Sequence, residues 1–253
     1  MSDHTRSILA EVAHRPWPLP SAPWVMYQSW RRLLFAHWPL PHDRLRAAVP
    51  GELTLDTFDG SAWLGLTPFR VTDLRPRGVP AIPVGSDFPE LNLRTYVRVG
   101  DRPGVYFFSL DAGSRLGVMG ARALYHLPYH AADMSQEERA GWIHYRSERS
   151  DGASAVFQGR YRPTGPAAAP AAGTLEHFLT ERYALYTVLG DGAVLRADIH
   201  HRPWPLQTAE AVIERNTVPE AEGLELPERA PLLHFAERQD TLVWAPERLE
   251  PPG

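Results

Sequence analysis

The stretch that decides the fold is FPELNLRTYVR, residues 88–98, in which polar and apolar side chains alternate. Because alternate side chains of a β-strand share a face, one face of this strand carries Glu90, Asn92, Arg94 and Tyr96. The other face is built of leucine, threonine and valine. In a strand with one solvent-exposed face the polar side chains point to solvent, whereas in a strand that lines a ligand cavity they can point inward. The residue pattern alone leaves both orientations open and slightly favours the solvent-facing one.

The composition describes a globular chain with a sizeable core. Apolar residues make up 43% of the 253 positions, and 25 prolines and 19 glycines are spread along the sequence, which suits many strands and turns better than long helices. A net charge of −4 argues against a nucleic-acid partner and gives no reason to dock on an anionic membrane. No apolar run is long enough to span a membrane, and no signal-type segment opens the chain, so we expect a cytoplasmic protein.

Two residue types are missing, and their absence excludes several chemistries. The chain has no cysteine, which rules out thiol catalysis, disulfides and cysteine-ligated metals. All 26 basic residues are arginine, so no side-chain amine is present to form a Schiff base. No nucleotide-binding glycine motif and no serine-hydrolase motif occurs. We therefore predict that the protein uses no cofactor.

The order of turn signals and apolar runs predicts one mostly β domain over residues 24–253, preceded by a lead-in segment over 1–23. Short helices are expected at 42–49, 114–124 and 174–179, the last capped by Thr174. A proline-rich loop is expected at 73–87. Strands are expected at 27–38, 61–72 (broken near Pro68), 91–99, 104–111, 142–149, 153–161, 182–189, 193–201, 206–215 and 239–244, the middle six pairing as hairpins.

The histidines do not form a metal-binding pattern. His200 and His201 are adjacent, so on a strand they point to opposite faces. His126 and His130 are four residues apart, but Pro128 between them argues against a helix that would bring them together. No HExxH motif occurs. We predict structural histidines and no metal site.

Several long segments resemble the YqjF-like bacterial family, a family of unknown function. They include LLFAHWPLP (33–41), LDTFDGSAWLGLTPF (55–69), GVYFFSLDAGSRLGV (104–118) and GTLEHFLTERYALY (173–186), and the resemblance covers roughly residues 24–246. That family looks related to the acetoacetate decarboxylase-like fold. The resemblance implies a large closed or partly closed antiparallel barrel with short helices and an internal pocket.

The same resemblance implies where the site lies, and it also shows that this chain cannot use the lysine-dependent chemistry of the decarboxylases. Strand 88–97 resembles the decarboxylase strand that points a glutamate into the pocket, so Glu90, and by alternation Asn92 and Arg94, would face inward. The decarboxylase lysine would fall near residues 120–122, where this chain has Ala121 and Arg122. Imine-forming decarboxylation is therefore excluded. The implied site holds Glu90 as a candidate acid or base, Arg94 and Arg122 for an anionic end, and Asn92 and Tyr125 to orient a carbonyl.

Three hypotheses for function follow. The first is a binding protein or lysine-independent enzyme for a small organic carboxylate or carbonyl compound. The second is a non-catalytic barrel that sequesters an apolar or amphiphilic ligand, with its aromatic side chains as the lining. The third is a structural protein whose polar row is a filled, mutually satisfied core. No nucleic-acid or membrane partner is expected, and a homodimer is the default for any assembly, because symmetric dimers are common.

Overall fold

The computed structural model describes residues 2–79, 85–114 and 125–249. This part of the chain is mainly β with short helices, as predicted from the sequence. Thirteen strands in the described residues join in one continuous sheet. The helices are short, and only the first lies in the lead-in segment: α1 (Asp3–Ala10), α2 (His42–Ala48), α4 (Leu175–Thr180) and α5 (Val218–Ala221).

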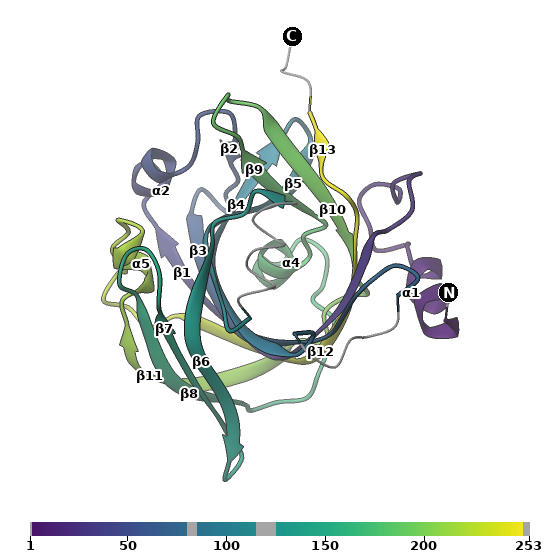
Figure 1. Cartoon of the computed structure of the whole chain (residues 1–253). Coiled ribbons are helices and arrows are strands. Elements are labelled where there is room, and N and C mark those ends of the chain that lie inside the picture. The colour runs from purple at the N-terminus through teal and green to yellow at the C-terminus, as the bar shows by residue number, and fades with distance from the viewer. Residues whose placement is uncertain (1, 80–84, 115–124, 250–253) are drawn as a thin grey trace.

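Seven of the described strands close into a ring, which is the barrel that Figure 1 shows nearly end-on. The chain of pairings runs from β12 through β1, β3, β4, β5, β9 and β10 and returns to β12. The predicted closed barrel is therefore confirmed. The bounds of these strands are β1 (Met26–Leu40), β3 (Ala62–Pro76), β4 (Phe88–Val99), β5 (Arg102–Ala112), β9 (Ala184–Val188), β10 (Val194–His200) and β12 (Leu232–Val243).

Four further strands form a second path from β5 to β12, pairing in the order β6 (Tyr129–Arg139), β7 (Trp142–Arg149), β8 (Val156–Pro163) and β11 (Gln207–Asn216). Together with β12, β1, β3, β4 and β5, which belong to both rings, they make a second ring of nine strands within the described residues. Two short strands add to the sheet, β2 (Thr54–Leu55) on β4 and β13 (Glu247–Arg248) on β10. The four strands β6, β7, β8 and β11 are called the wing here.

Most pairings are antiparallel, but β5 pairs in parallel with both β6 and β9. The three predicted hairpins, β4–β5, β7–β8 and β9–β10, are all present and antiparallel. Neither parallel pair is joined by a tight turn, so hairpin signals in the sequence do not report these two contacts. The barrel is therefore of mixed orientation rather than wholly antiparallel.

The predicted break at Pro68 is wrong: β3 runs through it without interruption. The reason lies in β1, which bulges at Arg32, a residue with a positive φ of 51°. The register between β1 and β3 shifts across the bulge, so the part of β3 around Pro68 pairs only with β4. Because Pro68 has no backbone N–H, it is tolerated where one ladder is already interrupted. The freed carbonyl of Arg32 accepts hydrogen bonds from Tyr161 and Gln136 of the wing.

Other differences from the sequence prediction concern element limits. The last long strand, β12, begins seven residues before the predicted 239, and β3 extends four residues into the predicted loop 73–87. The strand β6 was not predicted, because its sequence lacks alternating apolar residues. Most of the predicted helix 114–124 lies outside the described residues. The predicted helices at 42–49 and 174–179 are present, and Thr174 caps α4 through its side chain.

Both faces of β4 are covered, which answers the question that its alternating pattern raises. Leu91 and Leu93 point toward the wing and pack in a core with Tyr145 and Phe157. The polar row points the other way, into the seven-stranded ring. Because the second ring supplies an apolar core on the outer side, the polar row has no solvent face to occupy and lies inside the barrel.

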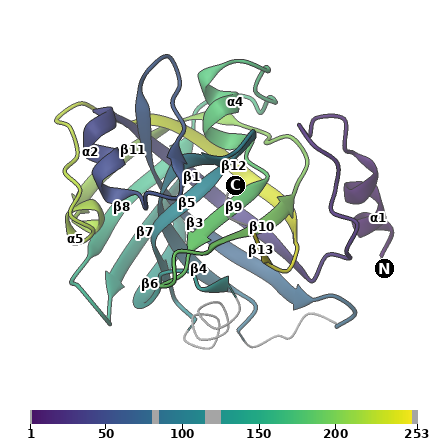
Figure 2. The same ribbon diagram turned by 90° about the horizontal axis from the view of Figure 1, so that it is seen from above.

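The helix α4 lies at one end of the barrel, and Figures 1 and 2 show it over the mouth of the ring. The lead-in segment lies outside the barrel beside β10 (Figure 2). It is attached there by Arg15, whose Nη1 donates to the carbonyl of Ile199 at 2.7 Å, and by Trp17, whose Nε1 donates to Asp198 at 3.0 Å.

Candidate functional site

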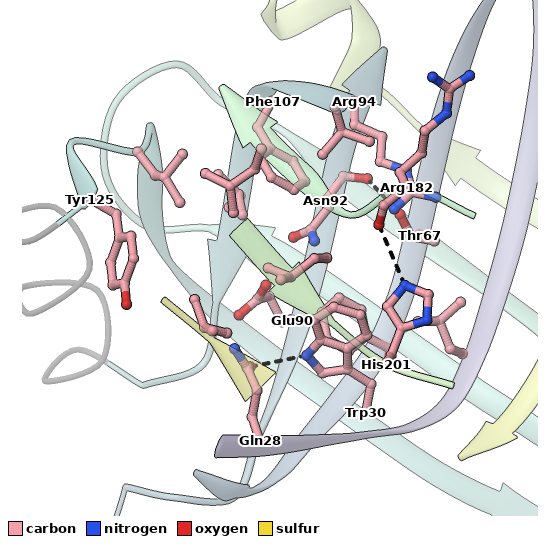
Figure 3. A pocket seen from close by; sticks show the side chains of 18 of the residues that line it. Gln28, Trp30, Thr67, Glu90, Asn92, Arg94, Phe107, Tyr125, Arg182 and His201 are labelled. Carbon is pink, nitrogen blue, oxygen red and sulfur yellow. Dashed lines mark hydrogen bonds between the residues drawn. The ribbon is translucent and has the colours of Figure 1, made fainter. Parts of the chain in front are cut away.

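A cavity of about 430 Å³ lies inside the seven-stranded ring, and Figure 3 shows its lining from close by. That volume is in the range of sites for small organic molecules. Glu90, Asn92 and Arg94 all line it, as does Tyr125. Much of the remaining lining is apolar or aromatic, including Trp30, Phe69, Phe88, Phe107, Leu110 and Trp204.

Glu90 is the buried carboxyl group of the cavity, with only 6% of its surface exposed. Burial raises its pKa from an ordinary 4.5 to about 7, and hydrogen bonds from Tyr129 and Asn92 oppose that rise. The Tyr129 hydroxyl donates to Oε2 at 3.3 Å. No cation among the described residues forms an ion pair with the Glu90 carboxylate. With a pKa of about 7 the group can take up or give a proton at neutral pH, and no described cation is paired with it.

Arg94 is the arginine among the described lining residues that lacks a carboxylate partner. Its Nη2 donates to the backbone carbonyl of Leu179 at 3.3 Å, while its Nε, though buried, has no hydrogen-bond partner. No ion pair joins it to any described Asp or Glu. Its guanidinium lies 5.3 Å from the ring centre of Phe35. Such a guanidinium keeps donors available for a ligand.

Asn92 lies between Glu90 and Arg94 along β4, as the side chains in Figure 3 show. It is 7% exposed, and its amide hydrogen-bonds to the Glu90 carboxyl. A carboxylate only accepts, so the amide nitrogen is the atom that faces it. The amide oxygen of Asn92 is buried without a partner. The polar row thus presents a carboxylate, an amide oxygen and a guanidinium in order.

The C-terminal end of α4 is fixed by the same row. The Tyr96 hydroxyl donates to the Leu179 carbonyl at 2.8 Å, and Nε2 of His37 lies 2.7 Å from that hydroxyl. Burial, with Arg94 nearby, holds the pKa of His37 well below its usual range. His37 is therefore neutral at pH 7 and acts as a positioning residue for Tyr96 rather than as an acid.

Arg182 is a cavity residue that the sequence interpretation missed. It follows α4, is 5% exposed, and donates from Nη1 to Asp56 at 2.7 Å and from Nε to the Phe178 carbonyl at 2.6 Å. Burial lowers its pKa, although Asp56 acts to raise it. The predicted strand 182–189 begins at Arg182, but β9 begins only at Ala184, so strand alternation does not set the direction of this side chain. Its charge is already balanced, which leaves Arg94 as the unpaired cation among the described lining residues.

An aromatic wall occupies another part of the cavity. Trp30 stacks on Trp204 at 5.9 Å between ring centres and meets the edge of Phe69 at the same distance. Trp30 is oriented by its Nε1, which donates to Gln28 at 3.0 Å (Figure 3). His201 lines the cavity beside them and contacts the Arg182 carbonyl through Nε2 at 3.4 Å. Such a wall suits the apolar part of a ligand.

Tyr125 lies on the side of the cavity away from Arg94 (Figure 3). Its hydroxyl is buried without a hydrogen-bond partner, and burial raises its pKa to about 12. The hydroxyl is therefore protonated and free to donate or accept. Arg122, the other predicted anion-binding residue, lies outside the described residues, so its role stays a prediction.

The described residues contain neither of two features considered above, a metal-binding cluster and a membrane-spanning helix. No group of three or more His, Asp or Glu side chains is placed to hold a metal ion. None of the described helices combines the length and apolar character needed to cross a membrane.

Residues 27–240, most of the chain, match the family DUF2071, described as an uncharacterized conserved protein. The chain belongs to the DUF2071 family. It is also 50% identical over 226 residues to the uncharacterized protein YqjF of Bacillus subtilis (strain 168), an alignment that covers 89% of this chain and 93% of YqjF. The YqjF-like resemblance of the sequence is thereby confirmed.

Solved structures with the same fold place this DUF2071 protein among acetoacetate decarboxylase-like barrels. An acetoacetate decarboxylase-like enzyme from Sphingomonas wittichii RW1 has a TM-score of 0.63 at 17% identity, covering 94% of this chain and 98% of its own. The acetoacetate decarboxylase of Legionella pneumophila has a TM-score of 0.60 at 16% identity, covering 96% and 95%. The enduracididine biosynthesis enzyme MppR, complexed with pyruvate, has a TM-score of 0.61 at 11% identity, covering 93% and 94%. At these identities the similarity shows the fold alone.

Proposed function

We propose that this DUF2071 protein binds a small organic carboxylate in its barrel, with the carboxylate group at Arg94. The observation that carries the proposal is the half-buried guanidinium of Arg94, which lines the cavity and has no carboxylate partner among the described residues. A guanidinium that lines a cavity and lacks a carboxylate partner can form an ion pair with an anionic ligand at little extra cost, because its side chain is already half-buried in the free protein. Charge-assisted hydrogen bonds to the planar guanidinium also orient the ligand.

A solved relative of the fold supports this choice of ligand class. MppR, with the same barrel, has been solved with pyruvate bound, a small carboxylate with a neighbouring carbonyl. That ligand belongs to MppR, and we use it only to choose probes. The aromatic wall around Trp30 and Trp204 suits a short carbon chain on the acid.

Glu90 is the proposed proton-exchanging group of the site. A pKa of about 7 lets it either take up or give a proton at neutral pH, which is the property that acid–base catalysis needs. Schiff-base formation is excluded because the chain has no lysine. The chemistry that we propose for this site is proton transfer by Glu90 and charge stabilisation by Arg94, without an imine.

The test is a calorimetric titration with acetate, pyruvate, acetoacetate, pentanoate and the neutral alcohol pentanol. We expect at least one acid to bind the wild type, and Arg94→Gln to weaken it by about 30-fold to 100-fold, the equivalent of losing a charge-assisted hydrogen bond. Arg94→Lys keeps the charge and should retain most of the affinity. Arg98→Gln is the matched control, because Arg98 lies on the same strand but is exposed.

Two outcomes would contradict the proposal. Equal affinity of Arg94→Gln and the wild type for the acid would place the anion elsewhere. Binding of pentanol but of no acid would favour the alternative function, sequestration of an apolar ligand by the aromatic wall. Thermal shift gives a second readout, because a ligand at 100 times its Kd adds about 2.7 kcal/mol to the free energy of unfolding.

A further inference from the structure

The cavity contains two opposite charges that do not neutralise each other. Glu90 and Arg94 lie four residues apart on one face of β4, and no ion pair joins them. At the rise of an extended strand their Cα atoms are about 13 Å apart. Long side chains shorten the gap between the charged ends, and Asn92 lies within it (Figure 3). A ligand that lies along this row meets a cation at one end and a carboxylate at the other.

The two groups at the Glu90 end can both accept further hydrogen bonds, although the Glu90 carboxyl already accepts from Tyr129 and Asn92. The ionised Glu90 carboxylate has no cation partner among the described residues, and the amide oxygen of Asn92 is buried and unpartnered. An unsubstituted carboxylate or the anion of a keto acid has no donor to offer them, since its oxygens only accept. An ammonium group offers three donors and a positive charge. It would satisfy the carboxylate and the amide oxygen together.

We propose that the acid bound at Arg94 also carries an ammonium group, held by Glu90 and Asn92, so that the ligand is a zwitterionic amino acid. This inference rests on the proposed function, because it assumes that the carboxylate lies at Arg94. Asn92 and Glu90 are then the specificity-determining residues, and the aromatic wall contacts the rest of the ligand.

The charge pattern gives plain acids and amino acids opposite pH profiles. Ionisation of Glu90 as the pH rises through 7 places a negative charge near the ligand. The other ionisable and charged groups among the described residues that line this cavity are Arg94, Arg182, His201, Tyr125 and Tyr129. Ionised Glu90 repels a plain carboxylate and attracts an ammonium group. Affinity for a plain acid should therefore fall, and affinity for an amino acid should rise, between pH 6 and pH 8.5.

The experiment titrates the whole protein by calorimetry with matched five-carbon acids at pH 6 and pH 8.5. The series contains the unsubstituted acid and the hydroxy and amino acids substituted at C2 or at C5. At pH 8.5 we expect one amino acid to bind about tenfold or more tightly than its unsubstituted and hydroxy counterparts. Glu90→Gln should remove that preference and the pH dependence, while Asn92→Leu should reduce the preference. Arg94→Gln should weaken every acid.

Each result decides one claim. If the unsubstituted or the hydroxy acid binds as tightly as the amino acid, or if the preference survives in Glu90→Gln, the inference is overturned, and the carboxylate site at Arg94 still stands. If amino acids bind with unchanged affinity to Arg94→Gln, the proposed function fails, because the carboxylate is not at Arg94. Circular dichroism of each variant checks that the barrel remains folded.

Discussion

Replacing Arg149 with methionine should lower the free energy of unfolding by about 3–5 kcal/mol, the usual cost of leaving a buried charge without its partner. Nε of Arg149 donates to Asp111 at 2.9 Å, and both side chains are 1% exposed. Nη1 donates to Glu222 at 2.9 Å. Arg149 ends β7 of the wing, whereas Asp111 lies on β5 of the barrel. The pair therefore joins the wing to the barrel, and urea unfolding of the variant measures its contribution.

Arg146→Met is the matched control on the same strand. Arg146 is 44% exposed and pairs with Asp133 and Glu148 at the surface, so its loss should cost no more than about 1 kcal/mol. The double variant Asp111→Leu with Arg149→Met should recover part of the stability that Arg149→Met loses, because the fully buried Asp111 charge is then absent and only the partly exposed Glu222 is left without its arginine. Equal losses for Arg149→Met and Arg146→Met would mean that the buried ion pair does not hold the wing.

Glu90→Gln should stabilise the protein, and the gain should grow with pH. The pKa of Glu90 is about 7 in the folded chain against an ordinary 4.5, so the folded state holds an extra proton between those values. Above pH 7 the buried group ionises and the native state carries the full penalty, about 3 kcal/mol from the size of the shift. Glutamine carries none of it. The variant should therefore gain up to about 3 kcal/mol at pH 8.5 and little near pH 4.5.

The measurement is urea unfolding of wild type and Glu90→Gln at pH 5, 7 and 8.5. Glu137→Gln is the control, because Glu137 is exposed on β6 and its replacement should change stability equally little at each pH. A Glu90→Gln variant that is less stable than the wild type at pH 8.5 would show that the carboxylate is compensated in the folded protein. That result would also argue against the proposed role of the Glu90 carboxylate in binding an ammonium group.

Local signals in the sequence predicted much of the fold. Alternation in residues 88–98, turn signals such as Asp191–Gly192 and the capping residue Thr174 each act within a few residues, and the structure has the corresponding strand, hairpin and helix. The strand β6 was not predicted from the sequence, because its half-buried side chains, such as Met134 and Gln136, do not form an alternating apolar pattern. Its place is set by pairing with β7 and by the carbonyl exposed at the β1 bulge.

The candidate site was predictable only in part, for a related reason. Period two puts Glu90, Asn92 and Arg94 on one face, but which face lies inside depends on the wing, and only the family resemblance indicated that. The Arg182–Asp56 pair is 126 residues apart in sequence, so no local pattern reports it. The unpaired state of Arg94 is likewise a property of the assembled barrel. The residue types in the sequence indicate which side chains could form a binding site. Tertiary contacts decide which of these side chains keep hydrogen-bonding atoms without a partner.

The most direct measurement of the central claim is a crystal structure of the protein with the tightest-binding five-carbon acid. We predict a carboxylate oxygen about 2.7–2.9 Å from a guanidinium nitrogen of Arg94, the distance of a charge-assisted hydrogen bond, with the carbon chain along the wall of Trp30 and Trp204. An acid bound in the cavity with its carboxylate directed away from Arg94 would contradict the claim.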